Sequence, residues 1–189
     1  GVDYDAYRAG GAFSHNDDKM LAKLEDAFRE GMLSVEDYHH TGISRISNVA
    51  VVANISHVFG IDPTDERSLT RGMIENRRIL GEYEEFYRQK IAGFANAEIV
   101  ASGSLLGVRE SRRILGDYVL NREDYDARRD FPDEIGRYNF PADIHPSHPG
   151  REELIAHKKL FRSSGCLFCL AAVLSLPLPL ELLEAHQLS

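Results

Sequence analysis

A run of charged side chains between two apolar stretches is the part of this sequence most able to do chemistry. The run holds three arginines and a glutamate: Arg109, Glu110, Arg112 and Arg113. The flanking stretches, residues 97–101 and 114–120, have the apolar pattern of strands. Because charge in or beside a buried sheet is costly unless it is paired, the run must either face a ligand or form ion pairs.

A guanidinium that faces a ligand can stabilise negative charge on it. Glycines at 103, 107 and 116 are typical of places where a ligand or another backbone comes close. On a strand, alternate residues share a face. Arg109 and Arg112 therefore point to opposite sides and cannot both serve one site. We favour Arg109 as the ligand-facing residue. The alternative is a structural set of ion pairs with Glu110 and Asp117.

A carboxylate and an imidazole stand two positions apart at Asp143 and His145. In an extended segment this spacing places both on one face, where the carboxylate could orient the ring for proton transfer. The alternative is a histidine that is only hydrogen-bonded ahead of Pro146.

Other histidines and the cysteines give weaker signals. His39 and His40 are adjacent, so their side chains point apart, and no carboxylate cluster joins them; a metal site is disfavoured. His57 ends an apolar run and is interpreted as a core residue. Cys166 and Cys169 have the spacing of a metal or redox pair, but one pair is half of a zinc or iron–sulfur site. We therefore expect no metal.

Several elements must position these residues. Apolar residues at helical spacing predict a surface helix that begins at Asn16 or Asp17 and ends at Gly31. Ser34 and Asp37 have the spacing of a capping box, which predicts a short helix over residues 35–40. The longest helix is expected over residues 62–92, with buried positions at Leu69, Met73, Leu80, Tyr83, Tyr87 and Ile91.

The remaining segments are less regular. Residues 2–13 are interpreted as a connector without a core of its own, and residues 49–58 as a strand with a polar end. A short helix or turn is expected over 122–129 and an edge strand over 138–145. The predicted fold class is α+β, with a mixed or antiparallel sheet of about four strands covered by one long helix and several short ones.

Composition excludes several classes of function. The 189 residues are 43% hydrophobic and 28% charged, with a net charge of −8, so no basic surface is available for nucleic acid. The most apolar run is too short for a membrane helix, so no membrane span is predicted. Two cysteines make no disulfide framework, and we expect a cytoplasmic protein.

Four stretches in order carry a resemblance to a known family: GMLSVEDYHH (31–40), FGIDPTDERSLTRG (59–72), LGVRESRRILGDYVL (106–120) and YNFPADIH (138–145). From Val2 to about Phe161 the chain resembles the substrate-side half of the FAD-dependent oxidoreductases with a glutathione-reductase-like flavin domain. The resemblance implies FAD as cofactor and a small-molecule substrate. It implies an iron–sulfur cluster in some relatives, which we do not expect here.

Within that resemblance, we assign catalytic roles to Arg109, Asp143 and His145, and flavin contacts to Arg112 and Arg113. No Gly-x-Gly-x-x-Gly follows a predicted strand, although that motif is where a flavin pyrophosphate meets a helix N-terminus. We therefore expect a fragment that binds FAD weakly by itself and needs a missing flavin domain as partner.

The end of the chain differs from the rest. Residues 163–189 are rich in leucine and proline and depart from the family. They are predicted to be an atypical tail, either translated out of frame or an unrelated terminus. The domain assignment is therefore a substrate domain over 1–162 and this tail. The alternative function is a non-catalytic α+β binding module that has lost its flavin domain; a histidine-based metallohydrolase is disfavoured.

Overall fold

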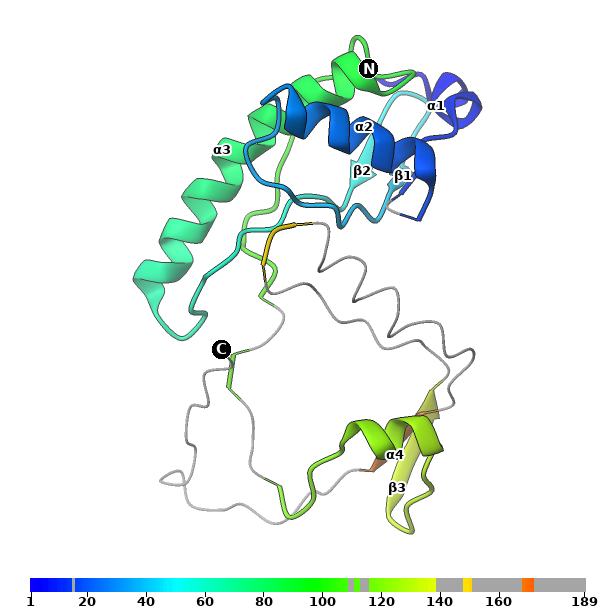
Figure 1. Cartoon of the computed structure of the whole chain (residues 1–189), viewed down its shortest axis with the longest axis vertical. Coiled ribbons are helices and arrows are strands. Elements are labelled where there is room, and N and C mark those ends of the chain that lie inside the picture. Colours follow the sequence, from blue (N-terminus) through cyan, green and yellow to red (C-terminus); the bar gives the residue numbers. More distant parts are fainter. Residues whose placement is uncertain (15, 109–110, 113–115, 139–147, 151–167, 172–189) are drawn as a thin grey trace. The chain divides into compact units, whose positions relative to one another are not determined.

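The computed structural model describes residues 1–14, 16–108, 111–112, 116–138, 148–150 and 168–171 (Figure 1). The chain divides into two compact units. The first contains residues 1–107 and 145–156, and the second contains residues 108–144 and 157–189. The fold is of mixed α+β class, as predicted, with four helices and four short strands among the described residues.

The first unit begins with a helix where a connector was predicted. Helix α1, Tyr4–Gly10, is capped by Asp3, whose carboxylate accepts a hydrogen bond from the Ala6 backbone N–H. Tyr7 is 2% exposed, and its ring and the Phe94 ring form a T-shaped contact with centroids 5.6 Å apart. The connector interpretation was wrong because the aromatic residues that suggested a linker belong to the core.

Helix α2, Asp18–Arg29, forms where the apolar spacing predicted it. Asp17 is the cap: its carboxylate accepts hydrogen bonds from the backbone N–H groups of Phe13, Ser14 and Met20. Gly31 follows the helix with φ of 71°, a left-handed conformation that favours glycine.

The long helix α3, Glu66–Lys90, is shorter than the predicted span of 62–92. The carboxylate of Asp62 binds the backbone and hydroxyl of Thr64 in a turn, and Asp65 caps the helix instead. Tyr83, Tyr87 and Ile91 are buried as predicted. In place of Leu69, Met73 and Leu80, which are only partly buried, the helix buries Ser68, Gly72, Ile79 and Phe86.

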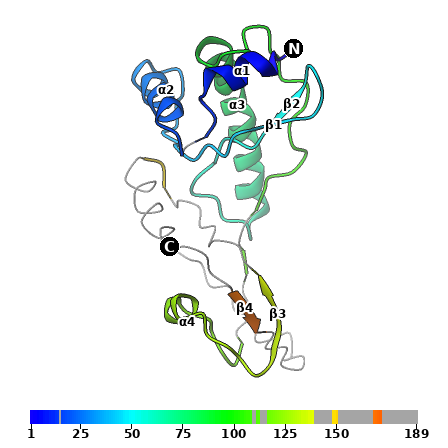
Figure 2. The ribbon, with the colours of Figure 1, turned by 90° about the vertical axis from the view of Figure 1, so that its right-hand side faces the viewer.

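One hydrophobic core joins α1, α2 and the C-terminal half of α3. Its buried members are Tyr7, Ala12, Met20, Leu24, Ala27, Leu33, Ile79, Tyr83, Phe86, Tyr87, Ile91 and Phe94. The N-terminal half of α3 extends beyond α2 in both ribbon views (Figures 1 and 2). That half of the helix therefore has surface outside the main core.

The predicted sheet of about four strands was wrong. The described strands form two separate antiparallel pairs, and the first pairs β1, Ile43–Arg45, with β2, Val51–Ala53. Residues 97–101 form no strand: Val100 is 85% exposed, and the Ile99 N–H meets the Glu84 side chain at 3.4 Å rather than a neighbouring strand.

The strand predicted over residues 49–58 is likewise shortened to Val51–Ala53. Ser56 has φ of 73°, a left-handed conformation that an extended strand cannot contain. The chain therefore turns just before His57.

The helix predicted over residues 35–40 does not form. A capping box requires reciprocal bonds between Ser34 and Asp37. Instead, the Ser34 N–H binds Glu82, the Asp37 N–H binds the Val35 carbonyl, and the Asp37 carboxylate binds His39 and His57. Partners far along the chain have replaced the local cap.

The second unit contains a short helix and the other strand pair. Helix α4, Arg122–Ala127, confirms the predicted helix or turn, and Asn121 and Asp124 form its capping box. Strand β3, Glu134–Tyr138, pairs antiparallel with β4, Phe168–Ala171. The second strand comes from the region predicted to be an atypical tail, whose assignment stays a prediction.

No helix within the described ranges combines the length and the apolar composition that crossing a membrane requires.

Candidate functional site

Most of the site residues predicted from the sequence lie outside the described residues. These are Arg109, Arg113, Asp143 and His145. Arg112 is described and is exposed. Their assignment to catalysis and flavin binding therefore stays a prediction.

The structure instead brings a buried carboxylate and an imidazole together in the first unit. Asp37 is 3% exposed. Its Oδ2 accepts hydrogen bonds from the backbone N–H of His57 and from Nδ1 of the same ring, each at 2.9 Å. Its Oδ1 accepts the backbone N–H of His39 at 3.0 Å. Three hydrogen bonds therefore fix the carboxylate and the ring together.

The charge on Asp37 is stabilised despite its burial. Burial raises the pKa of this carboxyl, but the hydrogen bonds and positive potential of His57 and the backbone N–H of His39 more than offset it, so the net pKa lies below the ordinary value. The carboxylate is thus ionised at neutral pH and holds the Nδ1 side of the imidazole.

The two neighbouring histidines contact different partners. The ring of His39 lies against that of His57, with centroids 5.0 Å apart. His40 meets the buried hydroxyl of Tyr87 through its Nε2. In the part of the chain that the structure describes, no group of three or more histidine, cysteine, aspartate or glutamate side chains is arranged to hold a metal.

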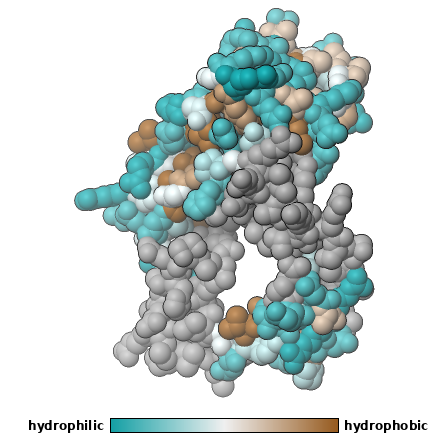
Figure 3. Space-filling view, in the orientation of Figure 1, coloured by the Kyte–Doolittle hydropathy of each residue, from teal (hydrophilic) through white to brown (hydrophobic). Residues whose placement is uncertain are grey.

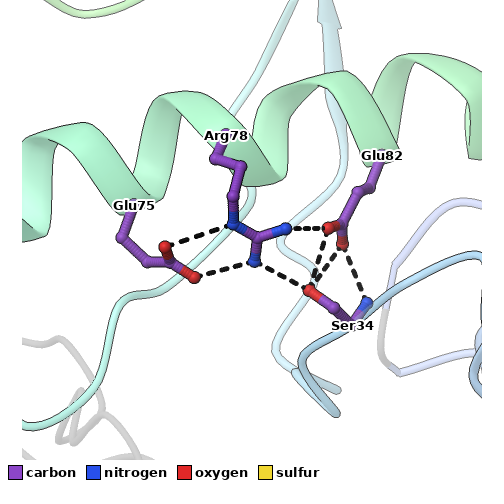
Figure 4. A network of polar contacts seen from close by, with 4 residues as sticks. All are labelled: Ser34, Glu75, Arg78 and Glu82. Carbon is purple, nitrogen blue, oxygen red and sulfur yellow. Dashed lines mark hydrogen bonds and ion pairs between the residues drawn. The ribbon is translucent and has the colours of Figure 1, made fainter.

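The loop that carries Asp37 is attached to α3 by a polar network (Figure 4). The Ser34 N–H donates to Glu82 at 2.8 Å, and the Ser34 hydroxyl donates to the same carboxylate. Arg78 joins Glu82 to Glu75 and donates to the Ser34 hydroxyl at 3.0 Å. Burial raises the pKa of Glu82, but the hydrogen bonds from Ser34 and Arg78 more than offset it and lower the pKa overall.

The backbone turn at Ser56 positions the other half of the pair. Ser56 has a positive φ after β2, and both the N–H and the ring of the next residue, His57, bind one carboxylate oxygen of Asp37. A non-glycine residue in this conformation is strained, and such strain persists only where surrounding contacts hold it. The hydrogen bonds to Asp37 are those contacts.

This arrangement can transfer a proton. An imidazole whose Nδ1 is held by an ionised carboxylate is oriented for general acid or base chemistry at its other nitrogen. The His57 side chain is 26% exposed, so it reaches the surface while Asp37 stays buried.

A hollow of about 580 Å3 opens along the chain immediately after His57. It is lined by two segments, residues 58–61 and the N-terminal half of α3: Val58, Phe59, Gly60, Ile61, Arg67, Thr70, Arg71, Ile74 and Glu75. The Phe59 ring lies 6.1 Å from that of His57. His57 does not itself line the hollow, but its ring lies next to that of Phe59, which does.

The described residues do not fit the pyrophosphate of FAD. A pyrophosphate binds where the N–H groups at a helix N-terminus are available to it. In the described part of the chain each helix N-terminus is instead capped by its own side chain: Asp3 for α1, Asp17 for α2, Asp65 for α3 and Asn121 for α4. Three of these caps carry negative charge, which repels a phosphate.

Sequence reasoning missed the pair of Asp37 and His57. Asp37 was assigned to a capping box and His57 to the core. Asp37 and His39 are two positions apart, the same signal that singled out Asp143 and His145. The helix predicted over 35–40 concealed it, and nothing local indicates that His57 is the partner.

Comparison with known proteins gives one match. A family model described as FAD dependent oxidoreductase matches residues 3–162. Neither the curated proteins nor the solved structures contain a match to this chain.

Proposed function

Because this chain belongs to the FAD-dependent oxidoreductase family, we propose that it forms the substrate-facing part of such an enzyme. The carrying observation is the buried Asp37, which holds Nδ1 of a partly exposed His57 at 2.9 Å beside an open hollow. In this proposal the hollow receives a small-molecule substrate, and His57 donates or accepts a proton there.

The flavin is held mainly by residues outside those described. The capped helix N-termini of the described residues support this proposal. We propose that Arg109, Arg112 and Arg113 form a wall of the flavin or substrate cavity. On this proposal residues 1–189 are inactive without a flavin-binding part.

The second candidate is a non-catalytic α+β binding module. The capped helix N-termini of the described residues support it, since without a flavin the hollow would serve to bind a ligand and not to oxidise or reduce it. The two candidates differ in whether the protein carries flavin at all.

The product of the whole gene distinguishes them. We expect residues 1–189 to purify colourless, and the whole product to carry flavin with its visible absorption band. A His57→Asn variant of the whole product should keep its flavin but slow substrate-dependent flavin reduction. If residues 1–189 alone carry nearly one equivalent of flavin, the proposal that another part of the protein holds the flavin is overturned. A whole product without flavin would support the binding module.

A further inference from the structure

The hollow beside α3 has the volume of a small-molecule site and is open to solvent. Its volume of about 580 Å3 falls within the usual range of ligand pockets. Four apolar side chains line it: Val58, Phe59, Ile61 and Ile74. Figure 3 shows hydrophobic residues among hydrophilic ones on the face of the molecule that carries α3.

Its apolar wall is set by close packing against the helix backbone. A Cβ placed on Gly72 would lie 3.1 Å from Cδ1 of Ile61 and 3.2 Å from Cδ2 of Leu106. The absence of a side chain at Gly72 therefore lets Ile61 lie directly on α3, and this part of the hollow is formed without a ligand.

Two guanidinium groups line the same hollow. Arg67 and Arg71 are four residues apart on α3, so they lie on one face of the helix. Nη2 of Arg71 donates to Oγ of Ser68 at 3.1 Å, and Ser68 is 2% exposed. A buried hydroxyl therefore orients the second guanidinium.

Two carboxylates close to these arginines in the chain have other partners. Glu75 also lines the hollow, but it pairs with Arg78 at 2.7 Å. Asp65 accepts the backbone N–H groups of Arg67 and Ser68 as the cap of α3. Within the described residues, neither Arg67 nor Arg71 forms an ion pair. The hollow therefore presents positive charge beside an apolar wall.

We propose that this hollow binds a small organic anion, with the two guanidiniums on its carboxylate or phosphate group and the apolar side chains on its hydrocarbon part. Guanidinium groups recognise both anions through paired hydrogen bonds. The identification of this anion as the enzyme's substrate rests on the proposed function. The binding of the anion to the hollow does not depend on it.

The test uses three probes with the same aromatic ring and different head groups: 3-phenylpropanoate, phenyl phosphate and the neutral 3-phenylpropanamide. Each is titrated into the 189-residue chain, and backbone amide shifts are followed by NMR. We expect saturable shifts over residues 58–61 and 67–75 with at least one anion, and at least tenfold weaker binding of the amide. Whichever anion binds more tightly identifies the head group.

Matched variants separate the arginines from general charge. Arg67→Gln and Arg71→Gln should each weaken anion binding roughly tenfold, the effect of about 1.4 kcal/mol. Arg77→Gln removes an exposed charge from the same helix outside the hollow and should leave affinity unchanged. Because Arg71 contacts Ser68, Arg71→Lys is the second variant there; it keeps the charge and should retain part of the affinity.

The inference is overturned if the amide binds as tightly as the anions, if no probe binds at millimolar concentration, or if Arg67→Gln and Arg71→Gln bind as Arg77→Gln does. These outcomes are separate from flavin content. If a gene product without flavin binds the anion, this inference is upheld and the proposed enzyme is rejected. If a flavin enzyme fails the anion test, the proposed enzyme is upheld and this inference is rejected.

Discussion

Nδ1 of His57 and Oδ2 of Asp37 lie 2.9 Å apart although 20 positions separate them in the chain. The same oxygen also accepts the backbone N–H of His57. The ring and the backbone of one residue are thus bound to a single buried atom of another. This joins the loop after α2 to the turn after β2.

Removing the carboxylate should destabilise the fold. Asp37→Ala leaves the N–H groups of His39 and His57 and the His57 ring without their acceptor, which we expect to lower the free energy of unfolding by about 2–4 kcal/mol. Urea unfolding measures it. Glu36→Ala, at an exposed neighbour, is the control and should change stability by less than about 0.5 kcal/mol. Equal effects would show that the pair contributes nothing to stability.

The contribution of Asp37 should depend on pH with a defined sign. Its folded pKa lies below the ordinary value of 3.8, so the unfolded chain takes up the proton first as pH falls. The stabilisation is therefore full above the ordinary pKa and is lost as pH falls below 3.8 through the folded pKa. The difference in unfolding free energy between the parent and Asp37→Asn should shrink over that acidic range. A difference in unfolding free energy that stays constant with pH would contradict the lowered pKa of Asp37 in the folded protein.

Two glycines give opposite predictions for the same substitution. Gly93 has φ of 85°, and a Cβ there would lie 2.1 Å from the Asp3 carbonyl oxygen. Gly93→Ala should therefore separate α1 from the end of α3, at a cost of more than about 2 kcal/mol.

Gly81, inside α3, has nothing within 4 Å of its Cβ position among the described residues. Gly81→Ala should raise stability by about 0.5–1 kcal/mol, which thermal unfolding can measure.

The attachment of the Asp37 loop to α3 can be tested at Glu82. Glu82→Ala removes the acceptor of the Ser34 N–H and hydroxyl, and we expect a loss of about 1 kcal/mol. Hydrogen exchange at the amides of His39 and His57 should accelerate, because the loop opens more often. Glu85→Ala removes an exposed carboxylate of the same helix and serves as control. Unchanged exchange would show that the network does not position the pair.

The predicted role of Arg109 can be tested in the flavin-bearing protein that the proposed function expects. Arg109→Lys should keep the fold and slow flavin reduction roughly tenfold to a hundredfold, or ~1.4–2.8 kcal/mol, if the guanidinium stabilises developing charge. A lower melting temperature with an unchanged rate would instead make Arg109 a structural partner of a carboxylate. Arg112 and Arg113 would then be the remaining candidates for the wall of the flavin or substrate cavity.

Helices were predicted better than strands, and for a physical reason. The cap at Asp17 and the apolar spacing of α2 are short-range features, and this helix forms where they indicate. Helix α4 forms within the stretch predicted as a short helix or turn. A strand needs a partner. Residues 97–101 have the composition of a strand, but the Ile99 N–H meets a side chain of α3 instead.

The sequence by itself determined the family, the α+β class and the approximate places of α2, α3 and α4. Motifs, caps and helical periodicity depend on residues that are close together in the chain. Only the tertiary structure decided which residues meet. Ser34 binds Glu82 across 48 positions, and Asp37 binds His57 across 20. Both contacts replaced the helix that local spacing predicted for residues 35–40, because several hydrogen bonds to distant, partly buried partners outweigh one local cap.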